Sequence, residues 1–214
     1  MKDVDRGALA LSAVLASVAG YVDAVGFLDT GGLFVSFMSG NTTQGAVDLL
    51  THAPAVALVS AGLVVSFVLG VTIGGVVTMR RTRPQTSIIA GTAVAVAVVA
   101  GLSAAGEVTL WRVGLLAAAM GALNTLFLAD GRARVAITYS TGTLVSLGLA
   151  LSSRVTGRSR TAWQRPLLLW SSLAVGAIIG GVAHRLGSTT ALGIAAMVLA
   201  GSALVWALRG RRAR

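Results

Sequence analysis

The sequence has 214 residues, of which 55% are hydrophobic and only 11% charged, and its formal net charge is +10. A soluble domain usually carries about 25% charged residues, so this composition excludes a soluble protein. It predicts an all-α membrane protein with one integral domain over residues 1–214. The sequence holds no cysteine, which excludes disulfides and thiolate metal sites. Its basic residues stand in short clusters between apolar runs, so we expect the lipid bilayer as partner and no nucleic acid.

Eight apolar stretches follow one another, each long enough for a membrane helix or a large part of one. The first follows Lys2 and Arg6, as in a signal peptide, but it is too long for a signal core. We therefore interpret it as the first membrane helix. The stretches cover residues 8–28, 33–50, 55–79, 86–105, 110–129, 135–151, 166–183 and 189–208.

Small and polar residues interrupt the second and the sixth stretch. Backbone can be irregular at membrane depth only where protein or a water-filled cavity satisfies its N–H and C=O groups. We therefore predict two broken segments that face a shared cavity near the midplane, with the rest of the chain as scaffold. The interruptions are Ser39, Gly40, Asn41, Thr42 and Thr43, and Ser140, Thr141, Gly142 and Thr143.

The two halves of the chain, residues 8–106 and 110–208, align with each other. Asp23 stands opposite Asn124, and the two interruptions stand opposite each other. The third and the seventh stretch carry matching glycines, which are Gly70, Gly74 and Gly75 opposite Gly176, Gly180 and Gly181. Three matches in the same order predict an internal repeat, an arrangement common in transporters.

The distribution of the 17 Lys and Arg residues predicts the topology. If the second and the sixth stretch enter and return on the same side, only Arg112 and Arg185 lie outside. Eight crossings would instead leave outside Arg80, Arg81, Arg83, Arg132, Arg134 and Arg185. The positive-inside rule favours the first arrangement, with six transmembrane helices, two re-entrant segments, two inverted three-helix repeats and both termini cytoplasmic. Because each broken stretch is short for a full dip, crossing as an unwound span remains the alternative.

Asp23 is the strongest candidate for a functional residue. An intramembrane carboxylate is costly unless it is paired, hydrated or protonated, and it usually marks an ion path, a proton relay or a ligand site. The structural alternative is a carboxylate that is wetted at the outer end or bonds neighbouring hydroxyls and backbone. Asn124 is its neutral counterpart in the second half.

The broken segments supply the other candidates. Ser39 or Asn41 is expected to cap a half-helix over residues 42–50, whose free N–H groups face the membrane interior. The alternative is helix packing by small residues. We expect contacts to a small polar solute or ion from Asp23, Ser39, Gly40, Asn41, Thr42, Asn124, Thr141, Gly142 and Thr143.

The repeated glycines predict close helix packing, because small residues three or four apart let two backbones approach. We expect the third and the seventh stretch to pack through these faces, within one chain or across a homodimer. The two histidines, His52 and His184, lie near the external ends of stretches without a second ligand at metal-binding spacing. No Ser–His pair is specified either, so we predict no enzyme, no metal and no cofactor.

Residues 20–41 resemble the YoaK-type bacterial membrane proteins, a domain-of-unknown-function family. The residues that carry the resemblance are Gly20, Asp23, Ala24, Gly26, Phe27, Phe34, Val35, Met38, Ser39, Gly40 and Asn41. The resemblance implies a multi-pass protein of the bacterial inner membrane, and it supplies no substrate.

These features predict a small secondary transporter or permease, with Asp23 and the two interruptions at a midplane site. The sequence has no nucleotide-binding loop, so ATP cannot drive transport directly. One alternative is a passive channel of aquaporin-like layout, although the paired Asn-Pro-Ala motifs of those channels are absent. The other is a membrane scaffold or assembly protein without transport.

Overall fold

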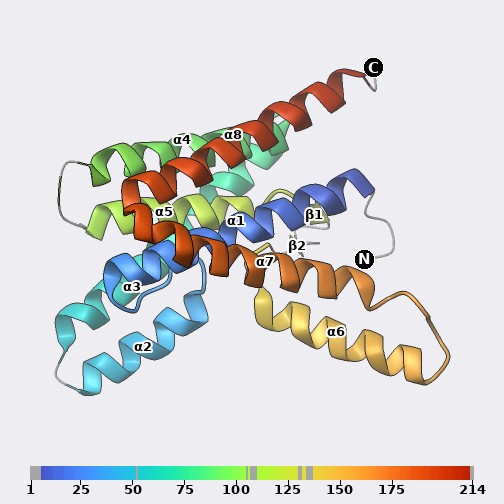
Figure 1. Cartoon of the computed structure of the whole chain (residues 1–214), viewed down its shortest axis with the longest axis horizontal. Coiled ribbons are helices and arrows are strands. Elements are labelled where there is room, and N and C mark those ends of the chain that lie inside the picture. Colours follow the sequence, from blue (N-terminus) through green and yellow to red (C-terminus); the bar gives the residue numbers. More distant parts are fainter. Residues whose placement is uncertain are drawn as a thin grey trace.

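The computed structural model describes residues 6–51, 53–104, 106, 110–129, 132–133 and 137–212. Most of the described chain is α-helical, with one short pair of antiparallel strands, one 3-10 turn and non-helical connections such as residues 31–37 (Figure 1). The α-helices are α1 (Arg6–Thr30), α2 (Met38–Leu50), α3 (Pro54–Arg80), α4 (Pro84–Ser103), α5 (Leu110–Leu123), α6 (Ser140–Val155), α7 (Gln164–Ala183) and α8 (Ser188–Arg212). The remaining elements are β1 (Leu128–Ala129), β2 (Arg132–Ala133) and the 3-10 turn η1 (His184–Leu186).

Five helices in the described residues are long and apolar enough to cross a membrane, namely α1, α3, α4, α7 together with η1, and α8. This confirms the predicted multi-pass membrane protein. Helix α5 is apolar but has only 14 residues, and at about 1.5 Å per residue it is shorter than the hydrocarbon core. Its role as the sixth crossing stays a prediction.

Local sequence explains where several helices begin and end. Pro54 and Pro84 occupy the first turns of α3 and α4, where a missing N–H is tolerated. Helix α1 ends before Gly31, whose φ of 71° lies in the left-handed region that favours glycine. The chain therefore leaves α1 in a sharp turn.

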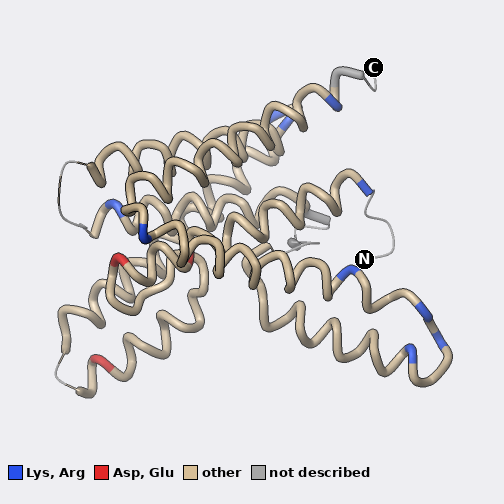
Figure 2. Tube along the Cα trace, viewed as in Figure 1, with Lys and Arg blue, Asp and Glu red and all other residues tan. Residues whose placement is uncertain are grey.

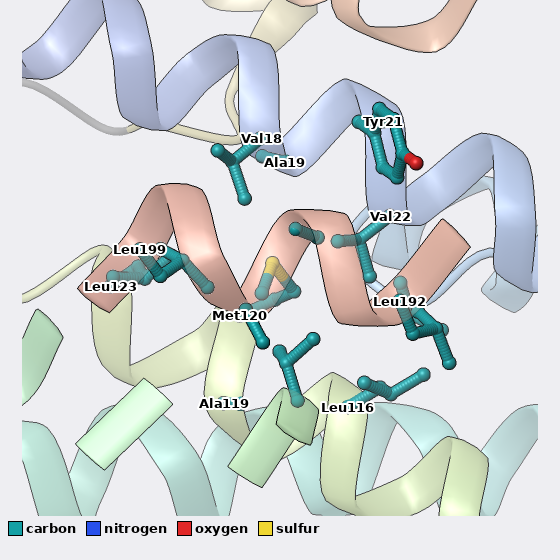
Figure 3. Close-up of a cluster of buried hydrophobic side chains, with 14 of the residues drawn as sticks. Val18, Ala19, Tyr21, Val22, Leu116, Ala119, Met120, Leu123, Leu192 and Leu199 are labelled. Atoms are coloured by element: carbon teal, nitrogen blue, oxygen red, sulfur yellow. The ribbon is translucent and has the colours of Figure 1, made fainter. Parts of the chain in front are cut away.

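The core lies between three long helix pairs, in which α1 packs along α7, α3 along α5, and α4 along α8. Figure 3 shows its centre, where Val22 of α1, Met120 of α5 and Leu192 of α8 are fully buried. Large apolar side chains also cover the outside, among them Leu58 of α3 and Ile178 of α7. Helices that are apolar on both faces are typical of membrane proteins.

Glycines allow the close pairing of these helices. A Cβ on Gly70 would collide with the carbonyl of Ala118 on α5, and one on Gly176 with the carbonyl of Ser17 on α1. A Cβ on Gly180 would collide with the carbonyl of Tyr21 on α1, and one on Gly74 with the hydroxyl of Thr125, just beyond α5. Gly75 and Gly181 differ, because a Cβ on either would meet no described neighbour within 4 Å. Within one chain, the packing expected at these two glycines is therefore absent from the described residues.

The two interrupted stretches differ from the prediction in where they break. Helices α2 and α6 begin at Met38 and Ser140, so the small polar residues form their first turns. The hydroxyls of Thr42, Thr43 and Thr143 each donate to a carbonyl four residues earlier, which satisfies them within a helix. The non-helical backbone precedes these turns, at residues 31–37 in the first half and, among the described residues, at 137–139 in the second.

Both short helices point outward from the middle of the molecule. Figure 1 shows that α1 ends and α3 begins at the same end of the molecule. Residues 31–37 turn from that end toward the middle, and α2 runs from the middle back to it. Helix α6 likewise begins near the middle and runs to the opposite end, where α7 begins. Helix α2 packs on α3 and α6 packs on α7.

Most of the charged residues lie near the two ends of the helices (Figure 2). Basic residues mark the α6–α7 connection and the last turns of α8, at the end where α1 begins. Arg112 in the first turn of α5 and Arg185 in η1 lie at the opposite end. Lys2 and Arg134, two residues used in the topology prediction, lie outside the described residues.

Candidate functional site

Asp23 holds the non-helical residues before α2. Its Oδ1 accepts hydrogen bonds from the backbone N–H groups of Val35 at 2.8 Å and Ser36 at 2.6 Å. Its Oδ2 accepts the hydroxyl of Ser36 at 2.5 Å. Among the described residues, Asp23 has no ion-pair partner. The carboxylate thus fixes this segment through neutral donors and keeps its charge uncompensated.

Asn124 holds the corresponding segment before α6 in the second half. Its Oδ1 accepts the backbone N–H of Thr138 at 3.2 Å, and its Nδ2 donates to the Thr138 hydroxyl at 3.0 Å. The same Nδ2 also donates to the carbonyl of Met120 at 3.0 Å. Asn124 lies one residue beyond the end of α5, not inside a helix as predicted, because the chain turns at that residue.

Asn41 has a different role from the predicted cap. Its Oδ1 accepts the N–H of Phe34 at 2.8 Å, and its Nδ2 donates to the carbonyl of the same residue at 2.6 Å. The side chain is fully buried. Asn41 therefore holds the non-helical segment against α2. The residue that precedes the first turn of α2 is Phe37, not Ser39 or Asn41.

The N-terminal turns of α2 and α6 line one cavity. They are preceded by Phe37 and Tyr139, and the described residues provide no side-chain cap at either turn. The cavity has a volume of about 540 Å³. It is lined by Ser36, Phe37, Met38, Ser39, Phe67, Asn124, Thr138, Tyr139, Ser140 and Thr141. The structure thus brings the two predicted interruptions together at Ser39 and Thr141, and Asn124 joins them.

A second cavity, of about 500 Å³, adjoins the first. The two share Phe37, Thr138 and Ser140. Asp23 lines the second cavity together with Gly20, Ala24, Phe27, Leu28, Phe34, Leu173 and Ala177. Asp23 therefore both holds the segment before α2 and faces a cavity.

The remaining predicted site residues line neither of these cavities. Gly40 and Gly142 lie under the rings of Phe37 and Tyr139, where a Cβ would collide with the ring. Thr143 lies within the first turns of α6. Thr42 lines a separate cavity of about 600 Å³ between α2 and α3. We therefore assign Gly40, Asn41 and Gly142 to the shaping of the two helix starts.

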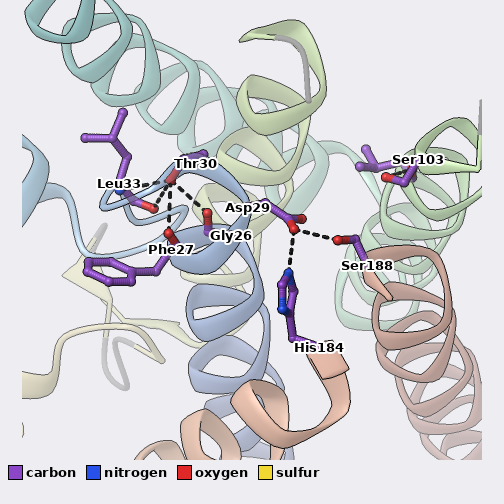
Figure 4. A network of polar contacts seen from close by, with 9 residues as sticks. Gly26, Phe27, Asp29, Thr30, Leu33, Ser103, His184 and Ser188 are labelled. Carbon is purple, nitrogen blue, oxygen red and sulfur yellow. Dashed lines mark hydrogen bonds and ion pairs between the residues drawn. The ribbon is translucent and has the colours of Figure 1, made fainter. Parts of the chain in front are cut away.

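The structure also shows a polar cluster that the sequence did not reveal. Asp29 Oδ1 lies 2.8 Å from Nε2 of His184 and accepts the hydroxyl of Ser188 at 2.5 Å (Figure 4). It ties the end of α1 to η1 and the start of α8. In a catalytic triad the histidine lies between the other two residues, whereas here the carboxylate does. The partners are separated by 155 residues or more, so no local spacing could indicate them. His52 lies outside the described residues.

Comparisons with known proteins place this arrangement in a family. No solved structure matches the chain. The UPF0700 transmembrane protein RA0705 of Rhizobium meliloti (strain 1021) is 37% identical over 198 residues, which cover 91% of this chain and 85% of that protein. Its description agrees with the membrane location and with the expected kind of family, while the YoaK name stays a prediction.

Residues 11–205, which include both cavities and most or all of every long helix, match one family description. The chain belongs to the family described as "Protein of unknown function (DUF1275)".

Proposed function

We propose that this protein is a small secondary transporter or permease of the bacterial inner membrane, with its solute site in the two central cavities. One observation carries the proposal, namely that the uncapped N-termini of α2 and α6 line the same cavity as Asn124. The backbone N–H groups and hydroxyls in such first turns can bind the polar groups of a solute. Transporters commonly form their sites from broken helices of two internal repeats.

An inverted repeat is supported by matching contacts in the two halves. Gly20 of α1 abuts the carbonyl of Leu173 on α7, and its counterpart Gly121 of α5 abuts the carbonyl of Phe67 on α3. Helices α1 and α5 run in opposite directions (Figure 1). We therefore assign residues 8–106 and 110–208 to two inverted repeats of three crossings each, with α5 as the sixth crossing.

The charges support a cytoplasmic location of both termini. The end of the molecule that carries Arg6 and the α6–α7 connection is the more basic one (Figure 2). The opposite end carries Arg112, Arg185 and Asp29. Under the positive-inside rule the basic end faces the cytoplasm, so residues 31–50 enter from outside and α6 enters from inside.

Cysteine accessibility tests the proposal directly, because the natural chain has no cysteine. Ser39→Cys and Thr141→Cys are each probed with a charged, membrane-impermeant thiosulfonate from either side of oriented vesicles. A transporter exposes the central cavities to one side at a time, so the reactive side changes with membrane potential or solute. Arg185→Cys and Arg81→Cys calibrate the two sides, since they should react only from outside and only from inside.

A passive channel is the second candidate, favoured by the two short helices that begin near the middle and run to opposite ends (Figure 1). A channel predicts that Ser39→Cys and Thr141→Cys react from both sides at once, independent of membrane potential. If neither cysteine reacts from either side, there is no aqueous path, and a scaffold without transport replaces both proposals.

A further inference from the structure

The cavity beside Asp23 has a chemistry of its own, set by one uncompensated carboxylate. The hydrogen bonds on Asp23 come from neutral donors, among them the backbone N–H groups of Val35 and Ser36 and the Ser36 hydroxyl. Neutral donors lower the cost of the buried charge but leave its sign unchanged. No Lys, Arg or His of the described chain pairs with it. A positive group entering this cavity would therefore gain the electrostatic partner that the protein itself does not supply.

Three phenylalanine rings form the wall next to that carboxylate. The centroids of Phe27 and Phe34 are 4.9 Å apart with the rings tilted, and those of Phe34 and Phe37 are 5.3 Å apart in an edge-to-face arrangement. All three residues line the same cavity as Asp23. The face of an aromatic ring carries negative potential and attracts cations, quaternary ammonium groups above all.

Apart from Thr138 and Ser140, the rest of the wall is apolar, and this lining favours one kind of cation. Leu28, Leu173 and Ala177 belong to the lining of this cavity of about 500 Å³, a size that holds a small organic molecule. A metal ion needs several oxygen or nitrogen ligands. The described residues contain no group of three or more His, Cys, Asp or Glu side chains that could supply them.

The corresponding position in the other half lacks this combination. The cavity at Asn124 has a neutral amide in place of the carboxylate, and its lining includes Phe37, Phe67, Tyr139 and hydroxyls from both short helices. The two cavities therefore differ in charge although they lie side by side. The preference for a cation belongs to the cavity that contains Asp23.

We propose that the cavity formed by Asp23, Phe27, Phe34 and Phe37 binds a monovalent organic cation, an ammonium group with apolar substituents. This inference rests on the proposed function in that it names the class of solute for the transport site. The carboxylate supplies the opposite charge, the rings cover the apolar substituents, and the connection through Phe37, Thr138 and Ser140 leads to the second cavity.

Binding of tetraethylammonium to the purified full-length protein in detergent tests the inference without requiring transport. Isothermal titration calorimetry compares it with 3-ethyl-3-pentanol, a neutral molecule of similar shape. We expect saturable binding of the cation and much weaker binding of the alcohol to the unaltered protein. Equal binding of the two molecules, or no binding of the cation, would overturn the inference.

Two variants locate the site. Asp23→Asn should weaken tetraethylammonium binding about tenfold or more, because a desolvated charge partner is lost. Phe34→Leu should weaken it about threefold while keeping an apolar wall. Phe127→Leu is the control, because Phe127 packs against Trp206 and lines neither central cavity. An affinity that stays unchanged in both Asp23→Asn and Phe34→Leu would place the ligand elsewhere and overturn the inference.

Uptake into proteoliposomes and the reactivity of the cavity cysteines distinguish a failure of this inference from a failure of the proposed function. Tetraethylammonium that binds but is not taken up by proteoliposomes supports the cation site and contradicts transport of this class of solute. Cavity cysteines that show alternating access, in a protein that does not bind tetraethylammonium, support a transporter and overturn the cation site.

Discussion

At the scale of single residues, Asp23 and Asn124 show how one position serves both folding and a site. Each side chain reaches the non-helical segment that leads into a short helix and bonds to its backbone. A carboxylate and an amide do this equally well, since both present an oxygen acceptor to a backbone N–H. The difference between them is charge, and that charge faces a cavity in only one of the two halves.

Substitutions at Asp23 should therefore separate the two roles. Asp23→Asn keeps an acceptor for the N–H groups of Val35 and Ser36 and should leave the fold intact. Asp23→Leu removes the acceptor and should lower the free energy of unfolding by about 1–3 kcal/mol for each buried donor left unpaired. Denaturation in mixed detergent micelles, followed by circular dichroism, measures both variants. If Asp23→Asn and Asp23→Leu destabilised the protein equally, Asp23 would not act as the hydrogen-bond acceptor for this segment.

At the scale of elements, the helix pairs depend on glycines at which two backbones meet. Gly176 lies against the carbonyl of Ser17, one turn from the place where Gly180 meets Tyr21. Gly181 follows Gly180 directly, but a Cβ on Gly181 would point into open space. Small residues turned toward lipid offer a surface for a second copy, and a homodimer through Gly75 and Gly181 stays a prediction.

A leucine should have a large effect at Gly176, which touches another helix, and a small one at Gly181, which does not. Gly176→Leu should prevent α7 from packing on α1 and abolish the folded, monodisperse protein, because the colliding atom belongs to backbone that cannot move aside. Gly181→Leu should change the free energy of unfolding by less than about 0.5 kcal/mol. Size-exclusion chromatography and thermal denaturation in detergent compare them. A folded Gly176→Leu protein with native thermal stability would show that this crossing is wrong.

Helix existence was predictable from the sequence, whereas helix starts were not. Apolar length alone predicts α1, α3, α4, α7 and α8. The interruptions at residues 39–43 and 140–143 were expected to break the helices, yet hydroxyls such as those of Thr42 and Thr143 bond to their own helix. The breaks occur earlier because Asp23 and Asn124, from other elements, hold the preceding backbone. Partners that distant in sequence leave no local pattern.

At the scale of the whole molecule, the predicted polar residues are divided between several places. Asp23, Ser39, Asn124 and Thr141 converge on the central cavities. Asn41 is used to build a helix start, and Thr42 lines a separate cavity between α2 and α3. Sequence pattern alone identifies polar residues at membrane depth, but only the packing of the helices shows which of them share a cavity.

The proposed function depends on α2 and α6 beginning at one shared cavity inside the membrane. The most direct measurement is intramolecular crosslinking of Ser39→Cys with Thr141→Cys by a short bismaleimide in native membranes, read as a mobility shift after cleavage between the halves. The pair Val47→Cys and Ser152→Cys is the control, because it lies far along the two diverging helices (Figure 1). We expect efficient crosslinking of the first pair and none of the second. Absence of a crosslink between residues 39 and 141, with both cysteines shown to react singly, would contradict it.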